Sequence, residues 1–230
     1  MFKSVFLGRP FGIATYIHWS FWILLLYIAA QYIPYGIEPV IYYVGLTVAV
    51  FACIVCHELG HALMAREFGI RTYDIHLYPI GGVARLERIP EQPLQEFLIA
   101  IAGPMVNVVI AFVLFGALGF NDHWFPNAEV LSGAAKGILG IVHALAAINV
   151  ALALFNLLPA FPMDGGRVFR ALLATKFGHL RATEIAAEVG KYMAVLMAIY
   201  GFANGQFSLM LLALFVYLSG KQEHFMVLMR

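Results

Sequence analysis

The sequence predicts an all-α polytopic membrane protein with about six transmembrane helices and a small membrane-associated β-hairpin or sheet. Hydrophobic residues make up 62% of the 230 residues, charged residues only 12%, and the mean hydropathy is +0.85. About a quarter of an ordinary soluble domain is charged. Several apolar segments are long enough to cross a bilayer, and one connection between them alternates between apolar and polar residues. This composition excludes a disordered chain, a nucleic-acid-binding domain and an ordinary cytosolic enzyme.

Each expected span reaches the length of about 17–25 residues that a transmembrane helix needs. The spans cover about residues 15–33, 41–65, 94–119, 137–158, 186–203 and 207–224. The first continues to Tyr32 and is not followed by a small-residue cleavage site, so we expect a span rather than a cleaved signal peptide. The fifth contains Lys191, and a helical stretch around 182–190 is expected to lie partly outside the bilayer.

Basic residues are distributed asymmetrically, although the net charge of +1 indicates no partner. Twelve of the fourteen Lys and Arg residues fall at the N-terminus, in the second and fourth connections, and at the C-terminus. They are Lys3, Arg9, Arg66, Arg71, Arg85, Arg88, Arg167, Arg170, Lys176, Arg181, Lys221 and Arg230. With six spans these places lie on one side, and basic connections are typically cytoplasmic. We therefore expect a multi-pass protein of the cell inner (cytoplasmic) membrane with both termini in the cytoplasm.

The second connection predicts a β-hairpin at the cytoplasmic face of the membrane. Residues 72–78 alternate between apolar and polar side chains, and residues 80–86 follow after a turn at Pro79. An unpaired edge of this hairpin could receive an extended peptide as an added strand. The alternative is a loop that only covers the membrane face.

The second span contains four polar side chains within an apolar stretch, namely Cys56, His57, Glu58 and His61. The last three follow the pattern H-E-x-x-H. Two histidines four residues apart on a helix point the same way and can bind one tetrahedral Zn²⁺. Glu58 lies about 100° round the helix, where it can flank the metal and reach a water molecule on it. The alternative is a polar seam between helices, which leaves the desolvation of three such groups unexplained.

A second pattern overlaps the first, because Cys53, Cys56 and His57 read C-x-x-C-H, which is typical of c-type haem attachment. That chemistry needs an exposed segment on the oxidising side, whereas this segment is an apolar helix near its cytoplasmic end. We interpret both cysteines as small buried residues, with Cys56 as a spurious candidate for a zinc ligand.

A catalytic zinc takes three protein ligands and keeps one position open. Pro159 and Pro162 break the chain after the fourth span and bring Asp164 to the same side of the bilayer as the histidines. Asp164 is the candidate third ligand; the alternative is an N-cap for a helix that begins near Gly165, and the two roles are compatible. Asn156 could stabilise an oxyanion or orient a substrate, or it could form an interhelical hydrogen bond.

Three motifs occur in a characteristic order: H-E-L-G-H at 57–61, G-P-x-x-N at 103–107 and N-x-x-P-x-x-P-M-D-G-G-R at 156–167. With the sequences at 12–20 and 81–84, they resemble the site-2 protease family of intramembrane zinc metalloproteases over about residues 10–175. The resemblance implies one zinc ion per chain held by His57, His61 and Asp164. It also implies that Glu58 is the general base and that Asn156 lies near the reacting carbonyl. From its place in a span, Asn107 is expected to hydrogen-bond a neighbouring helix.

The resemblance further implies cleavage of single-pass membrane proteins within or beside their membrane segment. The expected partners are therefore such a substrate and the lipid bilayer, with an adaptor protein or a second copy of the chain as further candidates and no nucleic acid. We expect one membrane-embedded protease domain over residues 1–230, with a catalytic core at about 10–175 and C-terminal helices at about 180–230. Neither an inserted PDZ domain nor a nucleotide-sensing domain is expected.

Two other classes of protein are compatible with polar residues in the spans. A polytopic zinc transporter needs acidic or histidine residues along a path through the bilayer, whereas these residues cluster at one depth. A proteolytically inactive scaffold that binds membrane proteins usually lacks the glutamate or one ligand, whereas all are present here.

Overall fold

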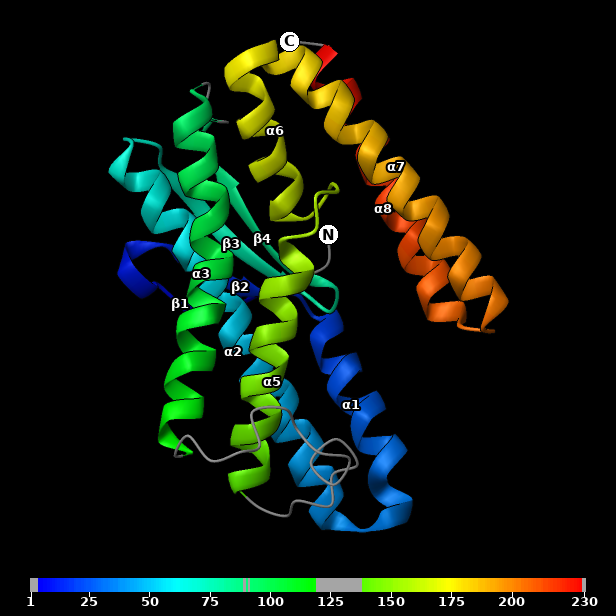
Figure 1. Ribbon diagram of the computed structural model, residues 1–230. Coiled ribbons are helices and arrows are strands. Elements are labelled where there is room, and N and C mark those ends of the chain that lie inside the picture. The colour runs from blue at the N-terminus through cyan, green and yellow to red at the C-terminus, as the bar shows by residue number, and fades with distance from the viewer. Residues whose placement is uncertain (1–3, 89, 91, 119–137, 229–230) are drawn as a thin grey trace. The chain divides into compact units, whose positions relative to one another are not determined.

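The computed structural model describes residues 4–88, 90, 92–118 and 138–228 (Figure 1). The N-terminal part contains strands β1 (Val5–Gly8) and β2 (Ala14–Ile17), the 3-10 turns η1 (Pro10–Gly12) and η2 (Ile33–Tyr35), and helix α1 (Ser20–Tyr32). Helix α2 (Ile37–Glu67), strands β3 (Thr72–Tyr78) and β4 (Gly81–Leu86), and helix α3 (Pro93–Ala117) follow. The last described elements are helices α5 (Ile138–Asn156), α6 (Asp164–Phe177), α7 (His179–Ala203) and α8 (Phe207–Leu228).

Four of the described helices, α2, α3, α5 and α7, are long and apolar enough to cross a membrane. Two shorter apolar helical stretches cover Ser20–Tyr35 and Phe207–Gln222. Each predicted apolar segment therefore contains a helix. A mostly helical membrane fold with a small sheet is confirmed, while the number of spans stays a prediction.

The predicted start of the first span, at about residue 15, is wrong. Residues 14–17 form β2, and α1 begins only at Ser20. Thr15 and Ile17 are buried because alternation along the strand places both on the inner face of the sheet. The His18 ring then lies beside the first turn of α1, where its Nδ1 is 2.6 Å from Ser20 Oγ and accepts a 3.4 Å bond from the Ser20 N–H. This bond satisfies a backbone donor that the start of a helix otherwise leaves unpaired.

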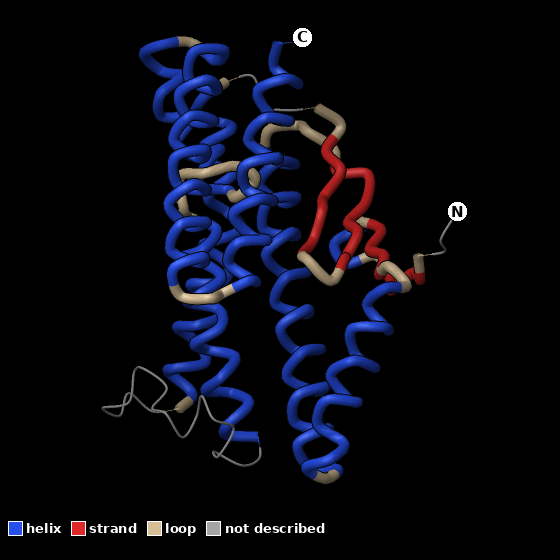
Figure 2. The backbone as a smooth tube through the Cα atoms, turned by 90° about the vertical axis from the view of Figure 1, so that its right-hand side faces the viewer, coloured by secondary structure: helices blue, strands red, loops and turns tan. Residues whose placement is uncertain are grey.

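The four described strands form one sheet in the order β1-β2-β3-β4, drawn in red in Figure 2. The outer pairs are antiparallel, and the central pair β2–β3 is parallel. The predicted hairpin is confirmed as β3–β4, with Tyr78 opposite Gly81 across a turn of two residues. The contribution of β1 and β2 was not predicted, because each is only four residues long and β2 merges in the sequence with the apolar helix that follows.

The inner face of the sheet packs against α2 and forms a hydrophobic core with it. Ile75 and Leu77 of β3 are at most 1% exposed, and Ile17 of β2 lies opposite Leu77. The buried members of this core are Ile13, Ile17, Phe21, Phe51, Leu59, Ala62, Ile75 and Leu77. These contacts fix β3 and β4 against the half of α2 that contains the histidine motif.

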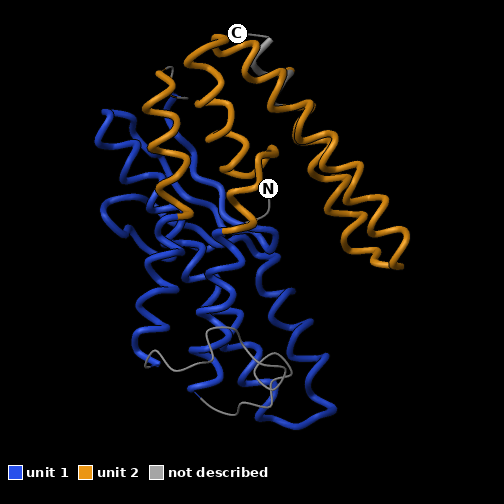
Figure 3. The backbone as a smooth tube through the Cα atoms, viewed as in Figure 1, with its two compact units in different colours: residues 1–88, 105–153 blue, residues 89–104, 154–230 orange. Residues whose placement is uncertain are grey.

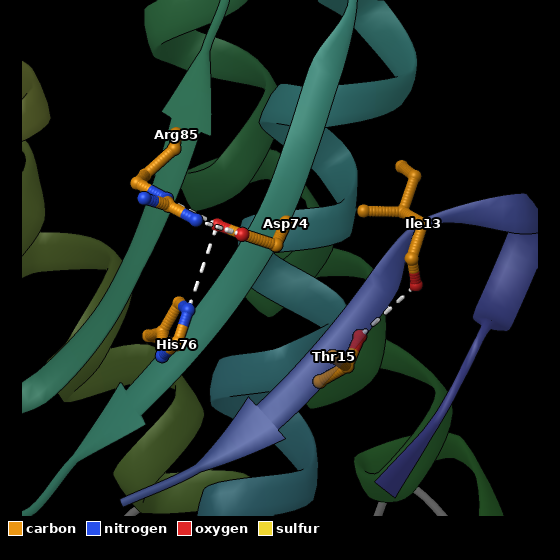
Figure 4. Close-up of polar contacts among 5 residues, drawn as sticks. All are labelled: Ile13, Thr15, Asp74, His76 and Arg85. Carbon is orange, nitrogen blue, oxygen red and sulfur yellow. Dashed lines mark hydrogen bonds and ion pairs between the residues drawn. The ribbon is translucent and has the colours of Figure 1, made fainter. Parts of the chain in front are cut away.

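The other face of the sheet contains a polar cluster, shown in Figure 4. Arg85 of β4 donates through Nε to Asp74 Oδ1 at 2.5 Å, and a second bond joins its Nη2 to Asp74 Oδ2. This guanidinium lowers the pKa of the Asp74 carboxyl below its ordinary value. His76 contacts the same carboxylate at 3.6 Å, and its ring stacks on Tyr16 of β2 at 5.0 Å. Cross-strand pairs of this kind fix the register of a sheet.

The chain forms two compact units, drawn in different colours in Figure 3. Unit 1 contains residues 1–88 and 105–153, and unit 2 contains residues 89–104 and 154–230. The boundary within α3 follows Pro104, and the boundary within α5 follows Ala153. Both helices therefore contribute to both units.

Unit 2 contains a buried ion pair between the first turn of α3 and the middle of α6. Arg170 is 1% exposed and Glu96 is 3% exposed. Arg170 donates to Glu96 Oε1 from Nε at 2.8 Å and from Nη2 at 2.5 Å, and His179 lies 3.8 Å from the other carboxylate oxygen. The Arg170 guanidinium also lies 5.0 Å from the centre of the Phe161 ring. One pair of charges therefore joins α3, α6, α7 and the segment before α6.

We expect Arg170→Met to destabilise unit 2 strongly, because it leaves Glu96 buried without its main counter-charge. Breaking a buried pair in this way costs about 3–5 kcal/mol. The matched control is Arg181→Met, which removes the exposed pair between Arg181 and Glu184, a contact worth about 0.3–0.5 kcal/mol. Thermal unfolding in detergent measures both variants. Equal melting temperatures for the two variants would contradict a structural role for the buried pair.

Candidate metal centre

Helix α2 presents His57 and His61 on one face, as their spacing predicts. The two rings lie nearly perpendicular with their centroids 4.7 Å apart, and their Nε2 atoms are 3.1 Å apart. Both side chains are buried, with exposed fractions of 6% and 9%. The prediction that these two histidines converge is confirmed.

This pair fits the geometry of a zinc ion. Zinc–nitrogen bonds of 2.0–2.1 Å in a tetrahedral arrangement place two nitrogen ligands about 3.3 Å apart. The separation of 3.1 Å between the two Nε2 atoms is close to that value. Two ring nitrogens held this close in a buried place are a suitable donor set for a metal ion.

Glu58 lies beside the second glycine of β4. A Cβ atom added at Gly82 would come within 2.5 Å of Glu58 Cγ and 2.8 Å of Glu58 Oε1. The strand backbone therefore runs directly along the Glu58 side chain, and a side chain at position 82 would force Glu58 to move. The glycine motif at 81–84 gave no signal in the sequence for this contact with Glu58.

Asn107 lies next to the histidine pair. Its Oδ1 is 2.6 Å from His57 Nδ1, and its Nδ2 donates to Asn149 Oδ1 at 2.8 Å. The expectation that Asn107 bonds a neighbouring helix is confirmed, because these partners belong to α2 and α5. That one of the partners is a histidine of the motif was missed, and the spacing of residues on α3 gave no signal for it.

Asn156 and Asp164 lie in unit 2, on either side of a short segment. Asn156 is the last residue of α5, and Asp164 is the first residue of α6. The N-cap position of α6 is occupied by Met163, and no side chain caps the helix there. The interpretation of Asp164 as an N-cap is therefore wrong.

The start of α6 packs against the backbone of the segment that precedes it. A Cβ atom at Gly165 would lie 2.3 Å from the carbonyl carbon and oxygen of Leu157, and one at Gly166 would lie 2.8 Å from the carbonyl carbon of Ala160. The two glycines permit this contact between main chains. It fixes Asp164 relative to the end of α5 within unit 2.

The two cysteines of the C-x-x-C-H pattern differ in burial. Cys53 is buried, and its Sγ lies 3.4 Å from Asn149 Nδ2. Cys56 is exposed on another face of α2, so the expectation that it is buried is wrong. Residues three apart on a helix differ by about 60° in direction, so one of the two thiols faces the interior of unit 1 and the other its edge.

A comparison with known protein families shows the family to which the chain belongs. The model of peptidase family M50 matches residues 45–128 and 127–198. The chain belongs to peptidase family M50. All five of the predicted site residues, His57, Glu58, His61, Asn156 and Asp164, fall within the matched residues.

Individual relatives are also similar to the chain. A zinc metalloprotease of Methanocaldococcus jannaschii is 37% identical over 220 residues, which are 96% of this chain and 60% of the relative. Stage IV sporulation protein FB of Bacillus subtilis is 28% identical over 133 residues, which are 56% of this chain and 40% of that protein. The chain thus spans 60% or less of the length of these two relatives.

A solved structure has a similar fold. The structure of the site-2 protease from Methanocaldococcus jannaschii superposes with a TM-score of 0.67 at 36% identity. The match covers 96% of this chain and 95% of the other. The resemblance to site-2 proteases that the sequence motifs indicated is confirmed.

We expect Gly165→Ala to destabilise this M50 chain, because the new methyl group would overlap the Leu157 carbonyl and the backbone would have to move. Overpacking of this kind costs about 1–3 kcal/mol. Gly45→Ala is the matched control, because nothing lies within 4 Å of a Cβ atom at that position of α2. The control should be neutral or stabilising by up to about 1 kcal/mol. The melting temperatures of both variants are measured in detergent. A Gly165→Ala variant as stable as the unchanged protein would mean that the backbone contact is loose.

Proposed function

We propose that this chain is an intramembrane zinc metalloprotease of the site-2 type. It hydrolyses peptide bonds in or near the transmembrane segment of single-pass membrane proteins. The observation that carries the proposal is the buried pair His57 and His61, with Nε2 atoms 3.1 Å apart and Glu58 on the adjacent face of the same helical turn.

The proposed metal ligands are His57, His61 and Asp164, with one zinc ion per chain. Each offers one ligand atom, a ring nitrogen from each histidine and a carboxylate oxygen from the aspartate. Two histidines and one carboxylate are a common set for catalytic zinc, since three protein ligands leave the fourth position open. The relatives named as zinc metalloproteases support this choice of metal.

Glu58 is the proposed general base. When bound, zinc supplies Lewis-acid chemistry that polarises a carbonyl and acidifies a water molecule. Glu58 accepts the proton of the attacking water and returns it to the leaving nitrogen of the peptide. Its contact with Gly82 restricts the side chain on the side of β4, which favours one position of the carboxylate. Asn156 is proposed to lie near the reacting carbonyl and to donate a hydrogen bond to its oxygen.

The proposed docking site for the substrate is the edge of β4. A helical substrate hides its carbonyl groups in backbone hydrogen bonds and must unwind before hydrolysis. In the described part of the chain, β4 is the last strand of the sheet, so one of its edges can pair with an extended peptide. Because Gly82 of this strand lies against Glu58, a peptide paired with β4 would pass close to the proposed base.

The proposed catalytic core covers about residues 10–175 within one membrane-embedded protease domain. An adaptor protein or a second copy of the chain is a candidate further partner. The distribution of basic residues supports an inner-membrane location with both termini in the cytoplasm.

We expect Glu58→Gln to slow cleavage strongly while zinc is retained. The amide keeps the size of the side chain but cannot accept the proton, and loss of a general base lowers the rate by about 10²–10⁴-fold. His57→Ala, His61→Ala and Asp164→Ala should instead lower the zinc content, which is about one ion per chain in the unchanged protein. The purified full chain is assayed with a membrane-protein substrate, and its zinc is measured by atomic absorption.

The results separate the proposed function from its rivals. Near-normal cleavage by Glu58→Gln would overturn the assigned base, and full zinc occupancy in Asp164→Ala would overturn the third ligand. A transporter would move zinc across vesicles without cleaving the substrate. A scaffold would bind the substrate and leave it intact, with or without a chelator.

We expect reporter fusions at both termini and in the 67–93 connection to report the cytoplasm. A fusion near residue 127, outside the described residues, should report the exterior. These results follow from an even number of spans and from the clustering of basic residues on one side. An external C-terminus would mean that α7 and α8 do not both cross the membrane.

A further inference from the structure

Two asparagines in unit 1 are completely buried and hydrogen-bonded to each other. Asn107 of α3 and Asn149 of α5 are both 0% exposed. Asn149 Nδ2 donates to the Leu145 carbonyl at 2.8 Å and lies 3.4 Å from Cys53 Sγ. Together with the bonds of Asn107, these contacts form a continuous series from the backbone of α5 to the ring of His57.

The series has a fixed direction, because it begins at a group that can only accept. The Leu145 carbonyl requires the NH₂ group of Asn149 to face it, so Asn149 Oδ1 faces Asn107. An acceptor at that place requires the NH₂ group of Asn107, so Asn107 Oδ1 faces His57. Each amide orientation is thus determined by the bond before it.

The last bond determines the tautomer of His57. Because Asn107 Oδ1 can only accept, the proton of a neutral His57 resides on Nδ1, and Nε2 presents its lone pair. Nε2 is the atom that lies 3.1 Å from His61 Nε2. A ring nitrogen without a proton is the form that binds a metal ion.

We propose that Asn107 and Asn149 are positioning residues that hold His57 in the tautomer and ring orientation that zinc requires. This inference rests on the proposed function, because it takes His57 as a zinc ligand. Asn107 acts directly on the ring, and Asn149 acts through Asn107. Groups that hold a ligating histidine in this way typically change metal affinity by about 10–100-fold when removed.

A role in helix packing alone makes a different prediction. Interhelical hydrogen bonds of asparagine stabilise membrane bundles by about 1 kcal/mol, and their loss would lower the melting temperature without a specific effect on zinc. Two measurements distinguish the two roles. One asks whether zinc affinity depends on a hydrogen-bond acceptor at residue 107, and the other asks whether the effects of the two asparagines on zinc affinity are independent.

The test measures zinc affinity of the purified full chain by competition with a chromophoric chelator. Asn107→Leu, which keeps a similar volume and removes the acceptor, should weaken zinc binding by about 10–100-fold. Asn107→Asp keeps an acceptor for Nδ1–H and should restore most of that affinity. Thr183→Val is the matched control, because it removes a buried hydroxyl bonded to the His179 carbonyl in unit 2 and should leave zinc affinity unchanged.

A double-variant cycle tests the connection through Asn149. If Asn149 acts only through Asn107, Asn149→Leu weakens zinc binding in the unchanged protein but adds nothing to Asn107→Leu. If the two substitutions each weaken zinc binding and their fold-changes multiply in the double variant, the asparagines act independently and the proposed series is overturned.

NMR of the protein with ¹⁵N-labelled histidine gives a second measurement. The His57 signal is identified as the one lost in His57→Ala. It should show a proton on Nδ1 that exchanges slowly with water, and this exchange should be faster in Asn107→Leu.

The outcomes distinguish this inference from the function on which it rests. Unchanged zinc affinity in His57→Ala would remove the proposed ligand and the proposed function with it. Loss of zinc in His57→Ala together with native affinity in Asn107→Leu would overturn only the positioning role. Equal weakening by Asn107→Leu and Asn107→Asp would show that the acceptor at residue 107 is not the operative group.

Discussion

Two imidazoles and a carboxylate within one turn of an apolar helix need polar partners, and unit 1 is arranged to provide them. Burial of a polar group without a hydrogen bond lowers the stability of a protein by about 1–3 kcal/mol, as measured with substituted proteins. His57 and His61 are nearly fully buried in α2. Asn107 and, through it, Asn149 supply partners from two other helices. The apolar side chains of the same helix complete a core with the sheet, so the polar turn is surrounded on several sides.

Unit 2 holds an acidic residue, Asp164, at the start of a helix that has no side-chain cap. Two consecutive glycines let the backbone of α6 lie directly on the preceding segment. The buried charges of Arg170 and Glu96 then join α6 to the first turn of α3. The position of Asp164 therefore depends on contacts between main chains and on an ion pair two helical turns away.

The sequence was sufficient for those features that repeat at short range. The spacing of His57 and His61 on a helix, the hairpin at Pro79 and the break before Asp164 all follow from neighbours along the chain. The close approach of Gly82 to Glu58, the bond from Asn107 to His57 and the pair of Glu96 with Arg170 join residues 24 to 74 positions apart along the chain. Periodicity carries no signal for such contacts, because the packing of whole elements determines them. The first strands were missed for a related reason, since pairing with β3 is what makes Ala14–Ile17 extended.

The two adjacent glycines that open β4 are required for different physical reasons. Gly81 has φ +141°, which L-amino acids rarely adopt, and nothing lies within 4 Å of a Cβ atom there. Gly82 has no such backbone conformation, but a Cβ atom there would overlap Glu58. An L-alanine would consequently be strained at position 81 by its backbone and at position 82 by overlap with Glu58. One dipeptide thus encodes handedness in its first residue and size in its second, although the two letters are the same.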